Sequence, residues 1–75
     1  MRGRAARTSL RSRLAGSARR LRSARGWTQE EAAERASLNP RHYQKIEDGV
    51  VNVTLKTIEQ LCQAFGVDVP ELFES

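Results

Sequence analysis

The polar side chains best suited to chemistry lie close together in the middle of this sequence. Arg41 and Lys45 stand four residues apart, so a helix places them on one side, and Gln44 and His42 flank them. Guanidinium, ammonium and amide groups can hydrogen-bond base edges in the DNA major groove, where arginine on guanine is the commonest specific contact. Arg41, Gln44 and Lys45 are therefore the candidate base-reading residues, and an ordinary solvated helix face is the alternative interpretation.

Residues around this group suit contacts to phosphate. Gln29 begins a predicted helix, where its side-chain amide and the free backbone N–H groups can bind an anion. Asn52 and Lys56 can approach phosphate from the other side of the base-reading helix. The expected phosphate-contacting residues are Gln29, Thr28, Asn39, His42, Asn52 and Lys56. Each of them has an alternative role as a surface residue or a local helix cap.

Catalytic and metal chemistry have little support. His42 is the only histidine, and no nucleophile or paired carboxylate is placed around it, so we expect no enzyme. The single cysteine, Cys62, lies in an apolar stripe, and no Cys/His cluster has metal-ligand spacing, so we expect neither a metal nor a cofactor. Arg22 and Glu47 could instead form a partly buried ion pair that holds the base-reading helix to its scaffold.

Apolar residues at helical spacing predict the scaffold that positions these groups. Thr28 and Glu31 form a capping box, and Trp27 before it would reach Ala32 as a hydrophobic staple. Capping residues, glycines and prolines mark the ends of five helices. The first helix is expected to start at Ser12 or Leu14 and to end at Gly26, and the second to run from Thr28 to Ala36. The third should start at Asn39 and Pro40 and end at Gly49. The last two should run from Thr54 to Gly66 and from Pro70 to Phe73.

The expected core follows from the apolar faces of these helices. The residues assigned to it are Leu14, Ala18, Leu21, Tyr43, Ile46, Leu55, Ile58, Leu61, Cys62, Phe65, Leu72 and Phe73. An apolar surface patch is also expected around Val67, Val69, Leu72 and Phe73. No segment alternates as a strand does, so the predicted fold class is all-α, with one compact five-helix domain over residues 12–75.

Charge is distributed unevenly along the chain. Residues 1–29 hold nine arginines and no acid, whereas residues 30–75 hold four lysines or arginines and nine acids. A basic segment of this kind suits nucleic acid or an anionic membrane. Residues 1–11 have one large aliphatic side chain and cannot bury enough to order themselves, so they are predicted to be a disordered basic arm. A solvated tail, a transit peptide and a leader are the alternatives for this segment.

Targeting signals and membrane segments are not evident. No apolar run is long enough to span a bilayer, and the N-terminus lacks the apolar segment of a signal peptide. The lone cysteine fits a reducing compartment. We therefore expect a cytoplasmic protein, associated with the nucleoid, that does not bind membranes.

Several groups of residues together resemble one family. They are Leu21-Arg22, Trp27-Thr-Gln-Glu-Glu-Ala-Ala33, Tyr43-Gln-Lys-Ile-Glu47, Gly49, Asn52-Val-Thr-Leu55 and Ala64-Phe-Gly-Val67. Over residues 14–73 the chain resembles the Cro/phage-repressor-type (XRE-like) helix-turn-helix family. The resemblance implies a lambda-repressor-like domain that binds double-stranded DNA and regulates transcription. It also implies that Gln29 contacts phosphate, that Arg41 and Lys45 read bases, and that Arg22 pairs with Glu47.

Two positions depart from the family pattern. Ala32 stands where a leucine is usual, and Trp27 would fill the gap; Pro40 stands where a base-contacting polar side chain is frequent. Free-standing members of this size resemble phage Cro and restriction-modification controller proteins, which implies a homodimer on palindromic operators. An antitoxin-like or adaptor module with a protein partner is one alternative function, and a non-specific nucleic-acid binder driven by the arm is another.

Overall fold

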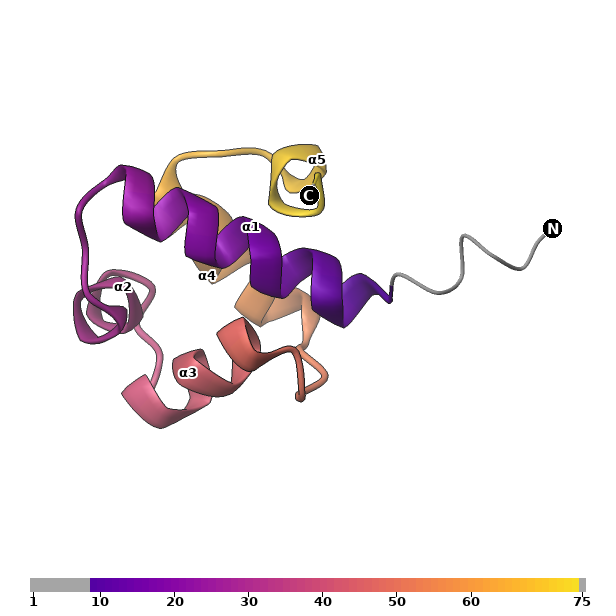
Figure 1. The fold of residues 1–75 in the computed structure, drawn as a ribbon, viewed down its shortest axis with the longest axis horizontal. Coiled ribbons are helices and arrows are strands. Elements are labelled where there is room, and N and C mark those ends of the chain that lie inside the picture. Colours follow the sequence, from indigo (N-terminus) through magenta and orange to yellow (C-terminus); the bar gives the residue numbers. More distant parts are fainter. Residues whose placement is uncertain (1–8, 75) are drawn as a thin grey trace, which may run out of the picture.

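The computed structural model describes residues 9–74, in which there are five helices and no strand. The all-α, five-helix prediction is therefore confirmed for this part of the chain. In Figure 1, α1 runs across the molecule, with α2 and α3 to one side of it and α5 to the other. The helices are α1 (Leu10–Ala24), α2 (Gln29–Arg35), α3 (Pro40–Asp48), α4 (Leu55–Phe65) and α5 (Val69–Leu72).

The start of α1 differs from the sequence prediction. The helix begins at Leu10 rather than Leu14, and its cap is Ser9, whose Oγ accepts a hydrogen bond from the backbone N–H of Ser12 at 3.1 Å. That bond satisfies an N–H group that would otherwise lack a partner at the helix start. Residues 10 and 11, assigned to the arm from composition, therefore belong to α1, while residues 1–8 of the predicted arm lie outside the described residues.

The core forms where the five helices meet. Tyr43 and Ile46 face inward from α3, as predicted, and are 0% and 1% exposed. Leu55 was wrongly assigned to the core: it is 79% exposed, because α4 begins there and its apolar stripe reaches the core only further along. The other fully or largely buried apolar residues are Leu14, Ala15, Ala18, Leu21, Ala32, Ala33, Ala36, Leu61, Phe65 and Leu72.

The C-terminal apolar patch is smaller than predicted. Leu72 is 0% exposed and cannot belong to a surface, because α5 lays it on the core. Val69 remains 51% exposed, while Val67 and Phe73 are half-buried. The helix also starts one residue before Pro70, after Asp68.

The helix ends next to the candidate site follow the predicted capping chemistry. Thr28 Oγ1 accepts from the Glu31 N–H at 3.0 Å, and the Glu31 carboxylate accepts from the Thr28 N–H at 2.8 Å. Asn39 caps α3 and Gly49 ends it in the left-handed conformation, with φ of 73°. In the turn between α2 and α3, Ser37 has a φ of 59°, which is unusual for a residue with a Cβ.

None of the helices within residues 9–74 combines the length and the apolar character that crossing a membrane requires.

Candidate nucleic-acid interface

The two sides of α3 have opposite environments. Tyr43, Ile46 and Glu47 point inward and are buried. The three predicted base-reading residues, Arg41, Gln44 and Lys45, are all exposed, and their side chains make no hydrogen bond or ion pair with another described residue. His42 lies beside them and is partly exposed. One side of the helix is therefore packed into the protein, and the other carries hydrogen-bond donors that have no partner among the described residues.

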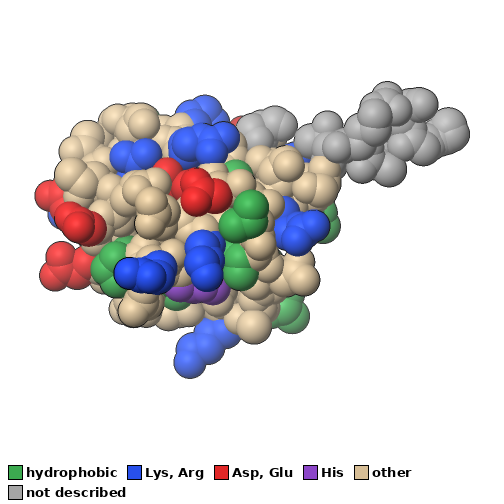
Figure 2. All heavy atoms as spheres, turned by 60° about the horizontal axis from the view of Figure 1, so that its bottom comes forward, with side chains coloured by type: hydrophobic (Ala, Val, Ile, Leu, Met, Phe, Trp, Pro, Cys, Tyr) green, Lys and Arg blue, Asp and Glu red, His purple; other side chains and the backbone are tan. Residues whose placement is uncertain are grey.

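The surface around α3 is mainly basic. Figure 2 shows Lys and Arg side chains on this face around the histidine, with acidic side chains at the edge over α2 and some among the basic groups. The acidic edge agrees with the exposure of Glu30, Glu31 and Glu34 on α2. A face of this composition attracts a polyanion chiefly over α3.

A hollow of about 460 Å³ lies between the first turns of α2 and α3. Its lining brings together four predicted site residues from two segments of the sequence. The lining residues are Thr28, Gln29, Glu30, Pro40, Arg41 and Gln44. Glu30 was not predicted as a site residue, since only the packing of α2 against α3 places it beside Arg41. Pro40 was not predicted as one because it has no polar side-chain group to contact a base.

The other predicted phosphate-contacting residues fall into two groups. Asn39 Oδ1 accepts from the backbone N–H groups of Arg41 and His42, at 2.8 and 3.4 Å, so its amide NH₂ is left for an outside acceptor. Asn52 and Lys56 are exposed but do not line the hollow. Asn52 instead borders an apolar depression that includes Leu10.

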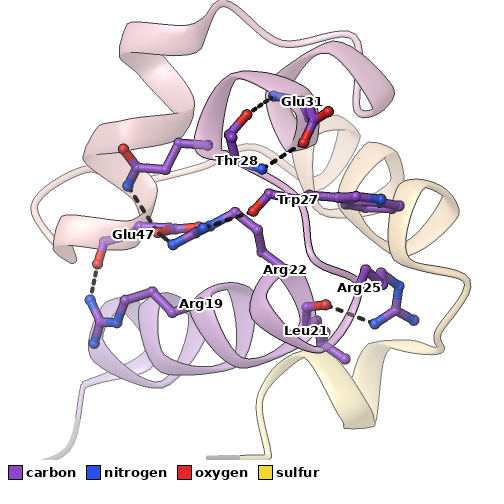
Figure 3. Close-up of polar contacts among 9 residues, drawn as sticks. Arg19, Leu21, Arg22, Arg25, Trp27, Thr28, Glu31 and Glu47 are labelled. Atoms are coloured by element: carbon purple, nitrogen blue, oxygen red, sulfur yellow. Dashed lines mark hydrogen bonds and ion pairs between the residues drawn. The ribbon is translucent and has the colours of Figure 1, made fainter.

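A buried carboxylate anchors the C-terminal end of α3. Glu47 is 1% exposed, and its two oxygens accept from Arg22 Nε at 2.6 Å and Arg22 Nη2 at 3.1 Å. The predicted ion pair between α1 and α3 is therefore present, in a two-pronged geometry. Arg22 Nη1 also donates to the backbone oxygen of Trp27 at 3.0 Å, so the same guanidinium holds the turn before α2 (Figure 3).

Two further donors complete this network. Gln29 Nε2 donates to Glu47 Oε1 at 2.9 Å, which commits one N–H of an amide predicted to contact phosphate and leaves its second N–H free. Arg19 donates from Nη1 to the backbone oxygen of Glu47 (Figure 3). Arg19 was missed from the sequence because its partner is a main-chain carbonyl, which every residue type supplies.

The ionisation of the network follows from its contacts. Burial acts to raise the pKa of Glu47, but hydrogen bonds from Arg22 and Gln29, together with the charge of Arg22, outweigh it and leave the pKa below its ordinary value. The hydrogen bond to Glu47 raises the pKa of Arg22. Burial raises the pKa of the Tyr43 hydroxyl far above its usual range, and the Glu47 carboxylate adds to this effect. The pair is therefore charged and Tyr43 neutral at neutral pH.

A cluster of aromatic and basic side chains lies at the C-terminal end of α1. The rings of Trp27 and Phe65 are stacked with centroids 5.9 Å apart, so Trp27 joins the α1–α2 turn to α4. Arg25 donates to the backbone oxygens of Leu21, at 2.9 Å, and of Phe65, and its guanidinium lies over both rings. The guanidinium of Arg35 lies 4.5 Å from the Trp27 centroid on α2's side. This cluster is structural, and like Arg19 it leaves little trace in the sequence.

Cys62 and the acidic groups form no metal site within residues 9–74. Cys62 is half-buried against the core, as its position in the apolar stripe predicted. Burial raises the pKa of its thiol, and the negative charges of Asp68, Glu59 and Glu71 raise it further. The thiol is therefore protonated and a poor nucleophile at neutral pH.

Comparisons with known proteins agree with this geometry. Residues 13–74 match a helix-turn-helix domain family. Over 53 residues, 71% of this chain and 69% of the relative, the sequence is 40% identical to an uncharacterised HTH-type transcriptional regulator, y4dJ, of Sinorhizobium fredii. The fold is similar to the crystal structure of a hypothetical transcription factor, NHTF, from Neisseria. The TM-score is 0.83, with 33% identity, and the match covers 88% of this chain and 76% of that one.

Proposed function

This chain belongs to the helix-turn-helix domain family of DNA-binding transcription regulators, and from that premise we propose that it recognises a specific double-stranded sequence with α3 in the major groove. Arg41, Gln44 and Lys45 are the proposed base-reading residues. Arg41 would contact guanine O6 and N7 through two N–H groups, and Lys45 would make a similar but less rigid contact.

One observation carries this proposal. Arg41, Gln44 and Lys45 are exposed and unpaired among the described residues, directly opposite the buried Tyr43 and Ile46 of the same helix. A solvated helix face of a small domain usually carries acids as well as bases, whereas the only acid on the exposed side of α3 is Asp48, at its last position. The two cations and the amide at the start and middle of the helix can donate to the acceptor-rich edge of guanine, and the amide oxygen of Gln44 can also accept a hydrogen bond.

Phosphate contacts would position α3 in the groove. Thr28, Gln29, Asn39 and His42 lie at the starts of α2 and α3, and the free N–H groups of Gln29 and Asn39 support this role. Asn52 and Lys56 would meet the backbone on the other side of α3. These contacts give affinity and orientation and contribute no direct sequence information.

The regulator is further proposed to act as a homodimer on palindromic operators, as a repressor or a controller-type protein in the cytoplasm, associated with the nucleoid. A dimer places two copies of α3 on half-sites about 34 Å apart, one turn of the duplex. The exposed Val69 and the half-buried Val67 and Phe73 support an apolar contact between copies. The same residues would serve an antitoxin-like or adaptor module bound to another protein, which is the alternative.

Selection of bound duplexes from a random library tests the proposal. We expect enrichment of one palindromic sequence, which the chain binds at least tenfold more tightly than a scrambled duplex of the same length and salt concentration. Binding that does not distinguish the two duplexes would contradict sequence-specific recognition. The mass of the protein alone at tens of micromolar separates the oligomeric alternatives, since a strict monomer favours the foreign partner.

A further inference from the structure

The hollow between α2 and α3 has an apolar element that the base-reading residues do not account for. Pro40 lines it at the first position of α3, beside Arg41 and Gln44, and is exposed. Pro40 is the only lining residue whose side chain has no polar group. A proline offers no polar contact to a base, so its effect on recognition must come from shape and apolar surface.

The backbone at Pro40 also favours an apolar neighbour. The first residues of a helix carry N–H groups without a partner in the helix, and burying such a group against an apolar surface is unfavourable. Proline has no N–H group, so an apolar group can cover this position without leaving a donor unpaired. Its ring has few conformations to lose when it makes a contact.

Apart from Thr28 and Gln29, which are proposed to contact phosphate, the lining of the hollow suits a base edge better than the sugar-phosphate backbone. Glu30 contributes a carboxylate to the lining, and a phosphate placed there would be repelled by it. A base edge carries no net charge. Within the major groove, the 5-methyl group of thymine is the apolar feature that the four base pairs display.

We infer that the ring of Pro40 contacts the 5-methyl group of a pyrimidine, in the base pair next to the guanine read by Arg41. The inference rests on the proposed function and makes it more specific. Pro40 and Arg41 are consecutive and line the same hollow, so the two contacts belong to neighbouring base pairs. The proline then discriminates between sequences, although it replaces a polar side chain at a position where family members often contact a base.

Removal of single methyl groups from the selected duplex tests this inference. Each thymine is replaced in turn by deoxyuridine, which keeps every hydrogen-bonding atom. We expect one replacement per half-site, beside the base pair whose recognition depends on Arg41, to weaken binding about fourfold, the effect of one buried methyl-sized group. Pro40→Gly should bind the thymine and deoxyuridine duplexes equally, because glycine has no side chain to contact the methyl group, whereas alanine would still offer it a methyl group.

One variant serves as a matched control. Pro70→Gly replaces the other proline, which is exposed on α5 and does not line the hollow, and should keep the full deoxyuridine effect. Thermal unfolding of each variant verifies that it is folded.

A further pair of duplexes identifies the source of the methyl group. They carry cytosine or 5-methylcytosine in place of the critical thymine. Tighter binding of the methylated duplex by the wild-type chain, lost in Pro40→Gly, would support a site that accepts any 5-methylpyrimidine. Equal binding of both, together with the deoxyuridine effect, would support a site selective for thymine.

The possible outcomes distinguish a failure of this inference from a failure of the proposed function. Specific binding in which no deoxyuridine replacement matters, or in which the effect persists in Pro40→Gly, overturns the role of Pro40 and leaves the proposed function intact. A selected half-site with no thymine beside the base pair that depends on Arg41 overturns it equally. Failure to prefer the selected duplex over a scrambled one overturns the proposed function, and the role of Pro40 with it.

Discussion

The two ends of α3 differ in almost every physical respect. At the C-terminal end, Glu47 is 1% exposed and accepts hydrogen bonds from side chains of both α1 and α2. From the first turn to the middle of the helix, Arg41 and Gln44 are exposed and make no side-chain hydrogen bond with another described residue. A helix of nine residues thus has a buried, hydrogen-bonded carboxylate near its C-terminal end and unpaired donors from its first turn to its middle.

The difference separates stability from recognition within one short helix. Donors that already have partners must break those bonds before they can contact a base, whereas donors in water lose only solvent contacts. A rigid anchor also holds the exposed donors in one orientation, which lowers the entropy lost on binding. Substitutions at the two ends should therefore have distinct effects.

The largest effect is expected at the anchored end. Glu47→Ala leaves Arg22 partly desolvated without its carboxylate, and removal of one member of a buried pair typically costs about 3–5 kcal/mol in the free energy of unfolding. Glu30→Ala, an exposed acid of α2, should change it by less than about 0.5 kcal/mol. Denaturant unfolding of both variants provides the measurement. Equal midpoints would mean that the ion pair contributes nothing.

A substitution on the exposed part of α3 should weaken DNA binding and leave the free energy of unfolding nearly unchanged. Arg41→Ala is expected to lose about 1–3 kcal/mol of binding free energy at one base pair per half-site, with little change in unfolding. Lys56→Ala, at a proposed phosphate contact, should weaken the selected and scrambled duplexes alike. Titrations of both duplexes at fixed salt would contradict this assignment if Arg41→Ala weakened them equally.

The stability contributed by Glu47, at the anchored end, should depend on pH. Because the folded-state pKa of Glu47 is lowered, its charge stabilises the fold at pH values above its unfolded pKa, about 4.3, and this stabilisation is lost as pH falls through the folded value. Wild type should therefore exceed Glu47→Gln in stability at pH 7, and the gap should narrow below about pH 4. A gap that stays constant to pH 3 would argue against the charged pair.

The smallest effect is expected in the turn that precedes the exposed end. Ser37 has a φ of 59°, where a Cβ is unfavourable, so Ser37→Gly should stabilise by up to about 1 kcal/mol, reduced by the greater freedom of glycine in the unfolded chain. Ser37→Val should be destabilising, because a β-branched residue fits this conformation poorly. Thermal melts of the pair test the turn geometry, and the reverse order would contradict it.

The sequence predicted the fold well because its signals are local. Capping residues such as Thr28 and Asn39, and the left-handed Gly49, mark helix ends by their own chemistry. The errors occurred at the starts of α1 and α5 and in the assignment of Leu55 to the core. A second serine near Ser12 hid the true cap of α1, and Leu55 was read as core because a stripe pattern does not reveal where along a helix the contact with the core begins.

The candidate site was less predictable for a different reason. Arg22 and Glu47 have complementary charges, which suggest a pair. Arg19 and Arg25 bind backbone carbonyls, and every residue has one, so the sequence gives no signal of these contacts. The commitment of one Gln29 N–H to Glu47, and the presence of Pro40 in the same hollow as Arg41, depend on how α2 packs against α3. Such relations between helices are set by tertiary packing.

The stacking of Trp27 on Phe65 gives the molecule its own optical probe. Trp27 is the only tryptophan of the chain, and it is half-buried with the guanidinium groups of Arg25 and Arg35 over its ring, at 5.8 and 4.5 Å from the centroid. Its emission should shift to longer wavelength when the ring leaves Phe65 for water. Because Trp27 does not line the hollow at the start of α3, its fluorescence should follow the loss of the scaffold while remaining nearly constant when DNA binds.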